Sequence, residues 1–458
     1  MMDQGEGSGR SRQGQAHQER APQERVVIDR VLRRLMPILM IAYFVAYLDR
    51  VNVGFASLTM NSDLGLSASA FGTGAGIFFL GYFLFEVPSN MLLARFGARR
   101  WIARIMIGWG VLSCLMAFVW DARSFYAVRL ALGLAEAGFF PGIILYLTYW
   151  FPQDYRARIV GWFMVAVPIS SVIGSPLSSG ILALASKDGG ALAGFKGWQW
   201  LFLIEGLPAV VLGFVILWAL TDRPEQATWL DPSQRDWLAR RLDDEHRRRE
   251  KAHGMTLFQA LTDGHVLALA AVYFGGVCGL YSLGFWLPQI VKGFGLGTFE
   301  TGLVVAIPHA IGAIGMVIWG RHSDRVNERR WHTAIASLVA CLGFALTPFV
   351  GGPVAKLITL SIAGLGVYAG LPVFWTLPTA FLAGAAAAAG IALINALGNL
   401  AGYVGPQIIG WIKDATGSFD QGLLFVAAMA LMSAVIVILL PRRRAISPGR
   451  PDPVGAGS

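Results

Sequence analysis

The sequence predicts an all-α membrane protein with twelve transmembrane helices in two six-helix halves. Of its 458 residues, 55% are hydrophobic and only 14% are charged, whereas soluble globular proteins carry about 25% charged residues. The apolar residues gather in runs long enough to cross a bilayer, which takes about 20 residues. Basic residues follow alternate runs, as the positive-inside rule requires of cytoplasmic loops, and one loop motif occurs twice.

Hydropathy places the spans and divides the chain into five parts. The spans run over 35–58, 70–94, 101–120, 124–148, 157–183 and 199–221, then over 265–291, 300–320, 332–351, 355–377, 387–411 and 421–441. The parts are a disordered cytosolic tail (1–32), an N-terminal bundle (33–221), a cytoplasmic linker (222–264), a C-terminal bundle (265–441) and a second cytosolic tail (442–458). The first tail is polar and lacks the apolar core of a signal peptide.

The loops predict the orientation. An even number of spans returns the C-terminus to the side of the N-terminus, and the basic loops place both termini in the cytoplasm. The arginines that support this are Arg95, Arg99, Arg100, Arg156, Arg158, Arg321, Arg325, Arg329, Arg330 and Arg442–Arg444. Membrane orientation therefore explains the net charge of +9, and we expect no nucleic-acid partner.

The linker carries charges of both signs, and Trp237, Leu238 and Leu242 form a narrow apolar stripe, which predicts a surface helix. His246 and His253 could bind a metal, but a solvated charge run is the favoured interpretation.

Three cysteines, Cys114, Cys278 and Cys341, fall in apolar spans without the spacing of metal ligands. We interpret them as packing residues and predict no metal site and no cofactor.

The repeated motif occupies residues 94–101, after the second span, and residues 324–331, after the eighth. The matching pairs are Arg95 and Arg325, Arg99 and Arg329, Arg100 and Arg330, and Trp101 and Trp331. Two related six-helix halves are the arrangement of transporters that rock about a central site.

Two adjacent charges interrupt the first span. Asp49 and Arg50 lie far from both ends of an apolar run, where a charge costs about 2.5–3.5 kcal/mol and is kept mainly for function. Neighbouring residues on a helix point about 100° apart, so each charge must find partners on other helices. The two residues either lock the bundle as a structural ion pair or combine a titrating carboxylate with an anion-binding guanidinium, and we favour the second.

The fourth span adds another base and acid, Arg129 and Glu136. They are seven residues apart, close to two helical turns, and share one face. A desolvated carboxylate holds its proton more tightly, whereas a nearby arginine favours the ionised form. The arrival or departure of an anion can therefore change the protonation of this region.

The loop motif resembles the signature of the major facilitator superfamily, Gly-x-x-x-Asp-Arg-x-Gly-Arg-Arg. The chain departs from it at Asn327, which replaces a glycine, and at Asn90 and Ala94, which replace the glycine and the aspartate of the first copy. Within this superfamily, the chain resembles the anion:cation symporters. The segments that carry this resemblance are Leu48–Asn52, Glu86–Asn90, Glu136–Gly142, Trp198–Gly206 and Gly390–Asn395. The likeness covers about residues 33–441, and Phe78–Asn90 with Gly97–Ile107 looks most like tartrate and related carboxylate permeases.

The resemblance implies roles for the charged residues. In the symporter family, the positions that match Asp49 and Glu136 carry protons, Arg129 interacts with them, and Arg50 binds the substrate carboxylate. A guanidinium suits this last role because its planar fork pairs bidentately with a carboxylate.

The resemblance also places Tyr47 and Tyr82 at the substrate, although a structural hydrogen bond would explain either hydroxyl. Trp375, Asn395 and Asn399 are candidates for the opposite wall, and an interface position would also explain Trp375. The motif loops are expected to act as latches, through Arg95, Arg99, Arg100, Asp324, Arg325 and Arg329.

Other polar residues in the spans support weaker hypotheses. We expect Glu86 to join the loop charges and Glu205 to pair structurally. His309 could bind substrate or titrate, and a hydrogen-bonded packing role explains it equally well. Residues 163–167 of the fifth span are wholly apolar, where sugar-acid transporters of this family usually place a polar group. This favours a smaller or less hydroxylated anion.

The sequence therefore predicts a secondary active transporter that imports a small organic anion with protons by alternating access. The expected anion is a tartrate-like dicarboxylate or a related sugar or aromatic acid. We expect a monomer that spans a bacterial-type inner membrane several times and is not an enzyme. The alternatives are a proton-driven exporter or uniporter of another metabolite and, less favoured, a membrane sensor or enzyme, for which the usual metal and nucleotide motifs are absent from the sequence.

Overall fold

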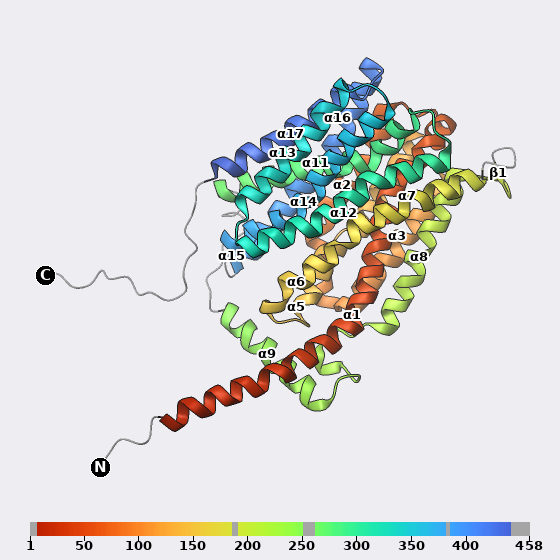
Figure 1. Ribbon diagram of the computed structural model, residues 1–458. Coiled ribbons are helices and arrows are strands. Elements are labelled where there is room, and N and C mark those ends of the chain that lie inside the picture. The colour runs from red at the N-terminus through yellow and green to blue at the C-terminus, as the bar shows by residue number, and fades with distance from the viewer. Residues whose placement is uncertain (1–6, 186–190, 251–261, 382–384, 441–458) are drawn as a thin grey trace, which may run out of the picture.

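The computed structural model describes residues 7–185, 191–250, 262–381 and 385–440, which form a bundle of helices (Figure 1). The first half contains α1 (Gly7–Leu64), α2 (Ala68–Phe96), α3 (Ala98–Leu115), α4 (Ala122–Glu136), α5 (Phe139–Thr148), α6 (Gln153–Met164), α7 (Ala166–Ala185) and α8 (Gly197–Ala219). After α9 (Pro232–Glu250), the second half contains α11 (Gly264–Lys292), α12 (Thr298–Val326), α13 (Arg330–Leu346), α14 (Pro353–Phe381), α15 (Ala385–Asn399), α16 (Ala401–Thr416) and α17 (Asp420–Leu439). Between α7 and α8, β1 (Ala191–Leu192) pairs antiparallel with β2 (Phe195–Lys196). The predicted tail 442–458 and His253 lie outside the described residues.

The predicted all-α membrane fold is confirmed, but the count of twelve spans is not reached. Among the described residues, 11 helical segments are long and apolar enough to cross a membrane. The predicted span 387–411 is not one of them, because α15 and α16 are two shorter helices that meet at Leu400. The predicted span 124–148 is also divided, into α4 and α5. Gly138 has a φ of 85° at that break, and a Cβ there would collide with Ser89 Oγ, so the position requires glycine.

The N-terminal segment differs from the prediction. The chain is helical from Gly7, whereas residues 1–32 were expected to be a disordered tail. Over the last turns before the first predicted span, the reason is an apolar stripe set among charged residues. Val27, Ile28 and Val31 lie on one face of α1 and are buried, so the helix has a packed side before it enters the membrane.

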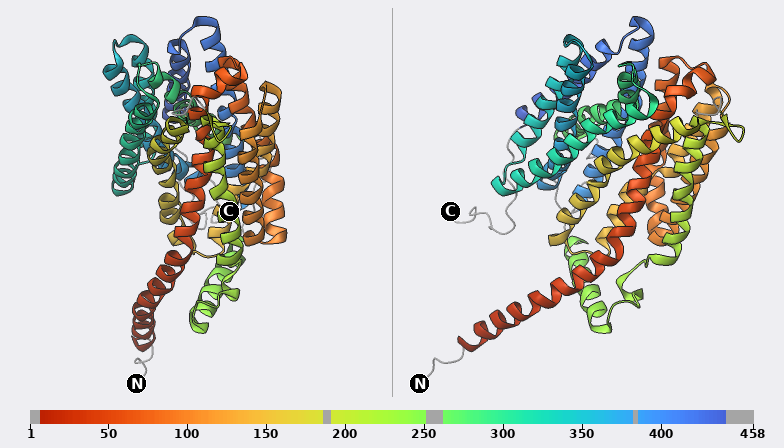
Figure 2. Two further views of the ribbon diagram at one scale, coloured as in Figure 1. Left: turned by 90° about the vertical axis from the view of Figure 1, so that its right-hand side faces the viewer. Right: turned by 45° about the vertical axis from the view of Figure 1, so that its right-hand side comes forward.

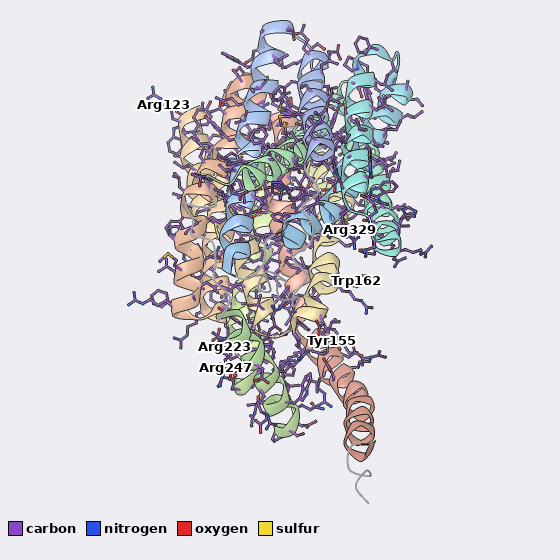
Figure 3. The ribbon with its side chains drawn as sticks, turned by 90° about the vertical axis from the view of Figure 1, so that its left-hand side faces the viewer. Arg123, Tyr155, Trp162, Arg223, Arg247 and Arg329 are labelled. Atoms are coloured by element: carbon purple, nitrogen blue, oxygen red, sulfur yellow. The ribbon has the colours of Figure 1, made fainter. Side chains whose placement is uncertain are left out.

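The linker helix packs against the first half at the end of the bundle from which the first turns of α1 project (Figure 2). We call this the linker end, and the opposite end the distal end. Arg30 of α1 contacts Asp231 beside α9 at 2.8 Å, and Arg156 of α6 contacts Glu245 of α9 at 2.9 Å. Leu238 of the predicted apolar stripe is buried. Figure 3 shows Arg247 of α9 below Tyr155 of α6 on this side.

The two halves contact each other closely at the distal end. There α7 packs along α12, as Figure 1 shows, and α2 packs along α16. The small surface of glycine makes this approach possible. A Cβ on Gly54 of α1 would collide with the carbonyl oxygen of Gly284 in α11, and a Cβ on Gly72 of α2 with that of Pro406 in α16. Small residues let membrane helices pack backbone against backbone.

Polar contacts strengthen the distal contact between the halves. Asp414 of α16 accepts hydrogen bonds from the backbone N–H groups of Ala68 and Ser69, at 2.9 and 2.8 Å. These N–H groups begin α2 and have no partner within the helix, and the positive end of the helix dipole favours a carboxylate there. Gln289 of α11 donates to Ser57 of α1 at 2.9 Å. The distal end is therefore closed in this structure.

We expect Gly54→Ala to destabilise the folded protein, because the added methyl group collides with a backbone oxygen that cannot rotate away. Overpacking of this kind costs about 1–3 kcal/mol. Gly276→Ala on α11 is the matched control, since a Cβ there meets nothing within 4 Å. Thermal unfolding of both purified variants tests this. A melting temperature for Gly54→Ala equal to that of Gly276→Ala would contradict the close packing.

Candidate functional site

The charged residues predicted from the sequence lie where the two halves meet. Asp49 and Arg50 belong to α1, which packs against α11 of the second half. Glu136 is the last residue of α4, directly before the break at Ala137 and Gly138. A carboxylate at the C-terminal end of a helix is disfavoured by the helix dipole, so Glu136 needs a cation close by.

Arg50 supplies this cation. Its Nη2 donates to Glu136 Oε1 in an ion pair, and its Nη1 donates to the hydroxyl of Tyr281 on α11 at 3.0 Å. The rings of Phe78 and Tyr82 each lie 5.4 Å from the guanidinium carbon. Arg50 is 8% exposed and Glu136 is 1% exposed. One guanidinium thus connects the acid of its own half to a hydroxyl of the other half.

Asp49 has a separate environment, as the 100° angle between neighbouring helical residues requires. Its carboxylate accepts hydrogen bonds from Trp109 Nε1 at 2.7 Å, from Asn52 Nδ2 at 3.0 Å and from Ser113 Oγ. All three donors are neutral, and two of them come from α3. Asp49 is therefore solvated by polar groups inside the first half, while Glu136 is paired with a cation.

Arg129 makes its hydrogen bonds to backbone oxygens. Its Nη2 donates to the carbonyl oxygen of Ala75 at 2.8 Å and its Nε to that of Gly74 at 3.3 Å. Its guanidinium carbon lies 5.0 Å from the centre of the Phe78 ring. The side chain thus links α4 to α2 through backbone oxygens. It also interacts electrostatically with Glu136 and Asp49, although it donates no hydrogen bond to either of them.

In the second half, the helices that carry the predicted wall residues pack around Tyr273, which was not predicted from the sequence. Tyr273 of α11 contacts Trp375 of α14 edge to face, with ring centres 4.8 Å apart. A Cβ on Gly398 of α15 would collide with the same tyrosine ring. Tyr273 therefore packs between the two helices that carry Trp375 and Asn395, while Asn399 is half-buried at the end of α15.

The two predicted tyrosines of the first half are both buried. Tyr82 lies beside Arg50, as described above. Tyr47 lies within electrostatic reach of Tyr281 and Tyr368 of the second half. The structure thus brings Arg50, Glu136 and Tyr82 together directly, and Tyr47 close to the opposite half.

The expectation for Glu86 is wrong. It does not join the loop charges, because its side chain is buried and its Oε1 accepts a hydrogen bond from Asn395 Nδ2 at 2.6 Å. The distance of Glu86 along the chain to the following basic loop does not indicate its depth. The signal that could have located it is its spacing from Tyr82, since residues four apart share one face of a helix.

Two further buried residues, Glu205 and His309, have hydrogen-bond partners. Glu205 of α8 accepts a hydrogen bond from Ser178 of α7 at 2.6 Å, as expected, and its Oε2 has no partner among the described residues. His309 Nδ1 and the hydroxyl of Tyr368 are 2.9 Å apart, which matches a packing role.

The motif loops repeat a backbone feature as well as a sequence. Gly97 in the first copy and Asn327 in the second both have positive φ, 89° and 50°. Asparagine is one of the few residues besides glycine that adopt this conformation at low cost. The substitution that departs from the superfamily motif therefore keeps a positive φ, although ψ is 38° at Asn327 and 147° at Gly97.

The contacts of the loop charges lie within their own halves. Arg329, which Figure 3 labels at the linker end, contacts Asp324 at 2.6 Å. In the first copy, where Ala94 replaces the aspartate, Asp222 after α8 accepts from the backbone N–H of Arg99 at 2.7 Å. The other predicted latch residues, Arg95, Arg100 and Arg325, are exposed. With the linker end in this state, the described loop residues show no ion pair that joins the halves.

Glu328 in the second loop illustrates the electrostatics outside the membrane. Partial burial raises the pKa of this carboxyl, but hydrogen bonds from His332 and from the backbone of Trp331 outweigh it. The pKa consequently lies below its ordinary value, and the carboxylate stays charged to hold the start of α13.

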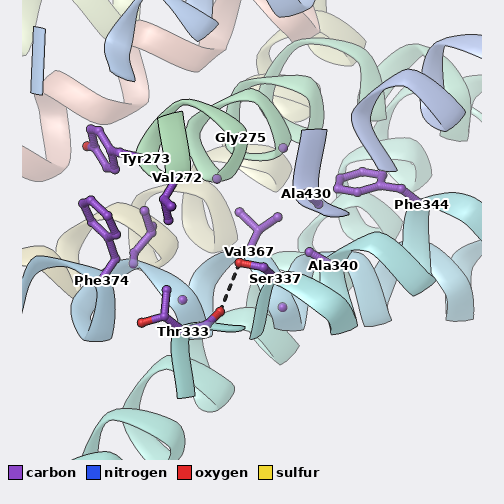
Figure 4. Close-up of a pocket in the computed structure, with 15 residues that line it drawn as sticks. Val272, Tyr273, Gly275, Thr333, Ser337, Ala340, Phe344, Val367, Phe374 and Ala430 are labelled. Atoms are coloured by element: carbon purple, nitrogen blue, oxygen red, sulfur yellow. Dashed lines mark hydrogen bonds between the residues drawn. The ribbon is translucent and has the colours of Figure 1, made fainter. Parts of the chain in front are cut away.

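A small cavity lies inside the second half (Figure 4). It is lined by residues of α11, α13 and α14, among them Tyr273, Ser337 and Phe374. Its volume of about 40 Å³ suits a few water molecules, whereas small-molecule sites take about 300–1,000 Å³. It is therefore too small to be the substrate site.

Comparisons with known proteins show which family this chain resembles. The model of the Major Facilitator Superfamily matches residues 39–406. A protein of Agrobacterium vitis named "Putative tartrate transporter" is 51% identical over 93% of this chain and 98% of its own length. The "Quinolone resistance transporter" of Acinetobacter baumannii is 42% identical over 91% of this chain and 95% of its own. The xylose transporter XylE of E. coli, in a partially occluded inward open conformation, superimposes with a TM-score of 0.71 at 14% identity, over 90% of this chain and 98% of its own.

We expect Arg129→Lys to lower stability, because a single ammonium group cannot reach both carbonyl oxygens that the guanidinium binds. Losing one hydrogen bond to a charged group costs about 1.5–3 kcal/mol. Arg123→Lys on the same helix is the matched control, since Arg123 is exposed at the surface in Figure 3. Thermal unfolding in detergent compares the two. An Arg129→Lys variant as stable as the control would remove the structural role.

Proposed function

The chain belongs to the major facilitator superfamily, and we propose that it imports a small organic anion together with protons. It is a multi-pass integral membrane protein and a transporter of small organic substrates, not an enzyme. The proposal adds the chemical class of substrate, the coupling ion and the direction. It also assigns the cytoplasmic side to the linker end and the membrane to the bacterial inner membrane.

The buried pair of Arg50 and Glu136 is the observation that supports the proposal. A buried guanidinium left without an anion costs several kcal/mol, so Arg50 must always have one. In the empty state Glu136 is that anion. When a substrate carboxylate takes its place, Glu136 is left as a desolvated carboxylate without a cation and binds a proton. Anion binding and proton binding are then two parts of one exchange.

The environment of the pair suits alternating access. Arg50 contacts Tyr281 of the opposite half, so an occupant of this position is contacted by both halves of one chain, and a monomer suffices. The distal end is closed by glycine contacts. With the linker end in the cytoplasm, this is the state in which substrate leaves for the cytoplasm or enters from it.

Two observations favour a small carboxylate. Phe163 of the apolar segment 163–167 stacks on Tyr43, with ring centres 4.3 Å apart, and is fully buried. It fills the side on which a larger hydroxylated sugar acid would need a polar partner. The relatives named for tartrate transport support a dicarboxylate in particular.

An exporter is the second candidate function, because one relative is named for quinolone resistance. The same exchange on Arg50 would serve export if the proton gradient drove it in reverse. The direction of transport separates the two candidates.

Uptake by proteoliposomes tests the proposed function. We expect labelled tartrate, within a panel that includes succinate and glucarate, to accumulate only when the outside is more acidic than the lumen. Dissipating the gradient with a protonophore should abolish accumulation. Accumulation that ignores the pH gradient, or the absence of transport of any carboxylate, would contradict the proposal.

Replacing the acids should uncouple transport. We expect Asp49→Asn and Glu136→Gln to lose gradient-driven accumulation of tartrate, because neither side chain can take up a proton, while some binding of tartrate remains. Glu300→Gln is the control, since Glu300 is exposed at the start of α12. If both variants still concentrate tartrate as the control does, the two residues are not the proton carriers.

Arg50→Lys should weaken tartrate binding although it keeps the charge, because an ammonium cannot make two parallel bonds to a carboxylate. The loss of one charged hydrogen bond corresponds to about tenfold to a hundredfold in affinity. Equilibrium binding at one pH measures it. A dissociation constant within about twofold of the original would place Arg50 outside the binding site.

A further inference from the structure

Glu86 is a buried carboxylate between the two halves that the exchange on Arg50 does not use. It lies on α2 and is 4% exposed. Its Oε1 accepts the hydrogen bond from Asn395 on α15, across the two halves. Its Oε2 is buried without a hydrogen-bond partner among the described residues. A half-satisfied carboxylate is costly in an apolar interior. Glu205 shares this feature within the first half, whereas Glu86 joins the two halves, so its position calls for an explanation beyond packing.

The surroundings of Glu86 connect it to the anion site. Tyr82 is four residues earlier on the same face of α2, and its ring lies against Arg50. From the elements packed around α2, the charged and titratable groups that interact with Glu86 are Arg50 of α1, Tyr82 of α2 and Tyr273 of α11, and Glu136 of α4 interacts in turn with Tyr82. The sequence of α15 contains no titratable residue. Arg50 is thus the cation nearest to both acids, and Glu136 already pairs with it.

Glu86 and Glu136 both belong to the first half, but they bind donors that belong to opposite halves. Glu136 is bound to Arg50, the anion-binding residue proposed for the first half. Glu86 is bound to Asn395, an amide donor predicted for the wall of the second half. In each case a carboxylate of the chain takes the hydrogen bonds that a substrate carboxylate would use.

We propose that Glu86 is an internal competitor of the substrate, which holds Asn395 while the site is empty and yields it to the entering anion. This inference rests on the proposed function, because it assumes an anionic substrate. Once the anion takes the amide of Asn395, Glu86 loses its hydrogen bond and faces a second negative charge. It then takes one proton from the adjoining aqueous side, and the ionised carboxylate becomes a neutral carboxylic acid. It returns that proton when the anion leaves and the bond to Asn395 forms again.

A purely structural bridge between α2 and α15 predicts something different. Such a bridge would stabilise one arrangement of the halves without changing the number of protons bound with the substrate. A competitor couples proton uptake to substrate binding. If one proton is taken up when the substrate binds, thermodynamic linkage makes the substrate affinity change by about tenfold per pH unit.

Tritiated tartrate binding to the full-length protein in detergent, measured between pH 6 and 8, separates these two roles. We expect the affinity of the unmutated protein to fall as pH rises. In Glu86→Gln the slope of log affinity against pH should decrease by about one proton, and the affinity at pH 8 should rise because the competing charge is gone. Glu300→Gln should keep the slope and the affinity of the unmutated protein.

An unchanged slope in Glu86→Gln, or a lower affinity at pH 8 with the original slope, would overturn the proposal and leave a structural bridge. If the unmutated protein binds no member of the carboxylate panel, the proposed function fails separately. In that case, infrared difference spectra recorded on acidification, without substrate, test whether Glu86 titrates. A protonated carboxyl band that disappears in Glu86→Gln but persists in Glu300→Gln supports a titrating Glu86, and identical spectra contradict it.

Discussion

The constraint on which the site depends is that Arg50, buried between two helical bundles, cannot remain without an anion. Its cost of desolvation is offset only by a carboxylate in direct contact. Several features of the chain follow from this. The helix break at Gly138 ends α4 at Glu136, so the acid lies at the position where the guanidinium can meet it. Phe78 and Tyr82 cover the guanidinium with aromatic rings, which tolerate a cation on their faces. On the side of the second half, the hydroxyl of Tyr281 accepts a hydrogen bond from the guanidinium. On the proposed function, an anionic substrate that enters this place must therefore exchange with a carboxylate of the chain.

The hydrogen bonds of Asp49 explain why it does not take part in this exchange on Arg50. Three neutral donors hold it within the first half, so its charge state does not depend directly on whether Arg50 is occupied. A transporter that couples protons to an anion needs a group that responds to the substrate and a path by which protons reach it. On the proposed function, Glu136 is the responding group and Asp49, on the adjacent face of α1, is a second proton position. On the further proposal, Glu86 is a second responding group, because it gives up a donor of the second half to the substrate.

Much of this was predictable from the sequence because the energetic penalties are large and local. Charges inside apolar runs identify Asp49, Arg50 and Glu136 without any knowledge of tertiary structure, and the repeated loop identifies the two halves. The pairings were not predictable, because they depend on how helices rotate against one another. Arg129 shares a face with Glu136 on an ideal helix, yet its guanidinium reaches the backbone of α2. Glu86 was misplaced because its distance along the chain to the basic loop was taken as depth. The stripe Val27, Ile28 and Val31 was missed because polar residues on the other face lower the average hydropathy of that segment.

The closed distal end and the divided helices together explain how one site can serve both sides. The contacts that seal the distal end are made by α7 on α12 and by α16 on α2, and α7 and α16 are the distal portions of a pair of divided helices in corresponding places of the repeat. Their partners toward the linker end, α6 and α15, are separate helices that end at Met164 and Asn399. A continuous helix would transmit any tilt along its whole length. On the proposed function, a divided helix lets α15, with Asn395, change its angle while α16 remains packed on α2, so that the linker end closes on an occupied site before the distal seal of glycines and Asp414 opens.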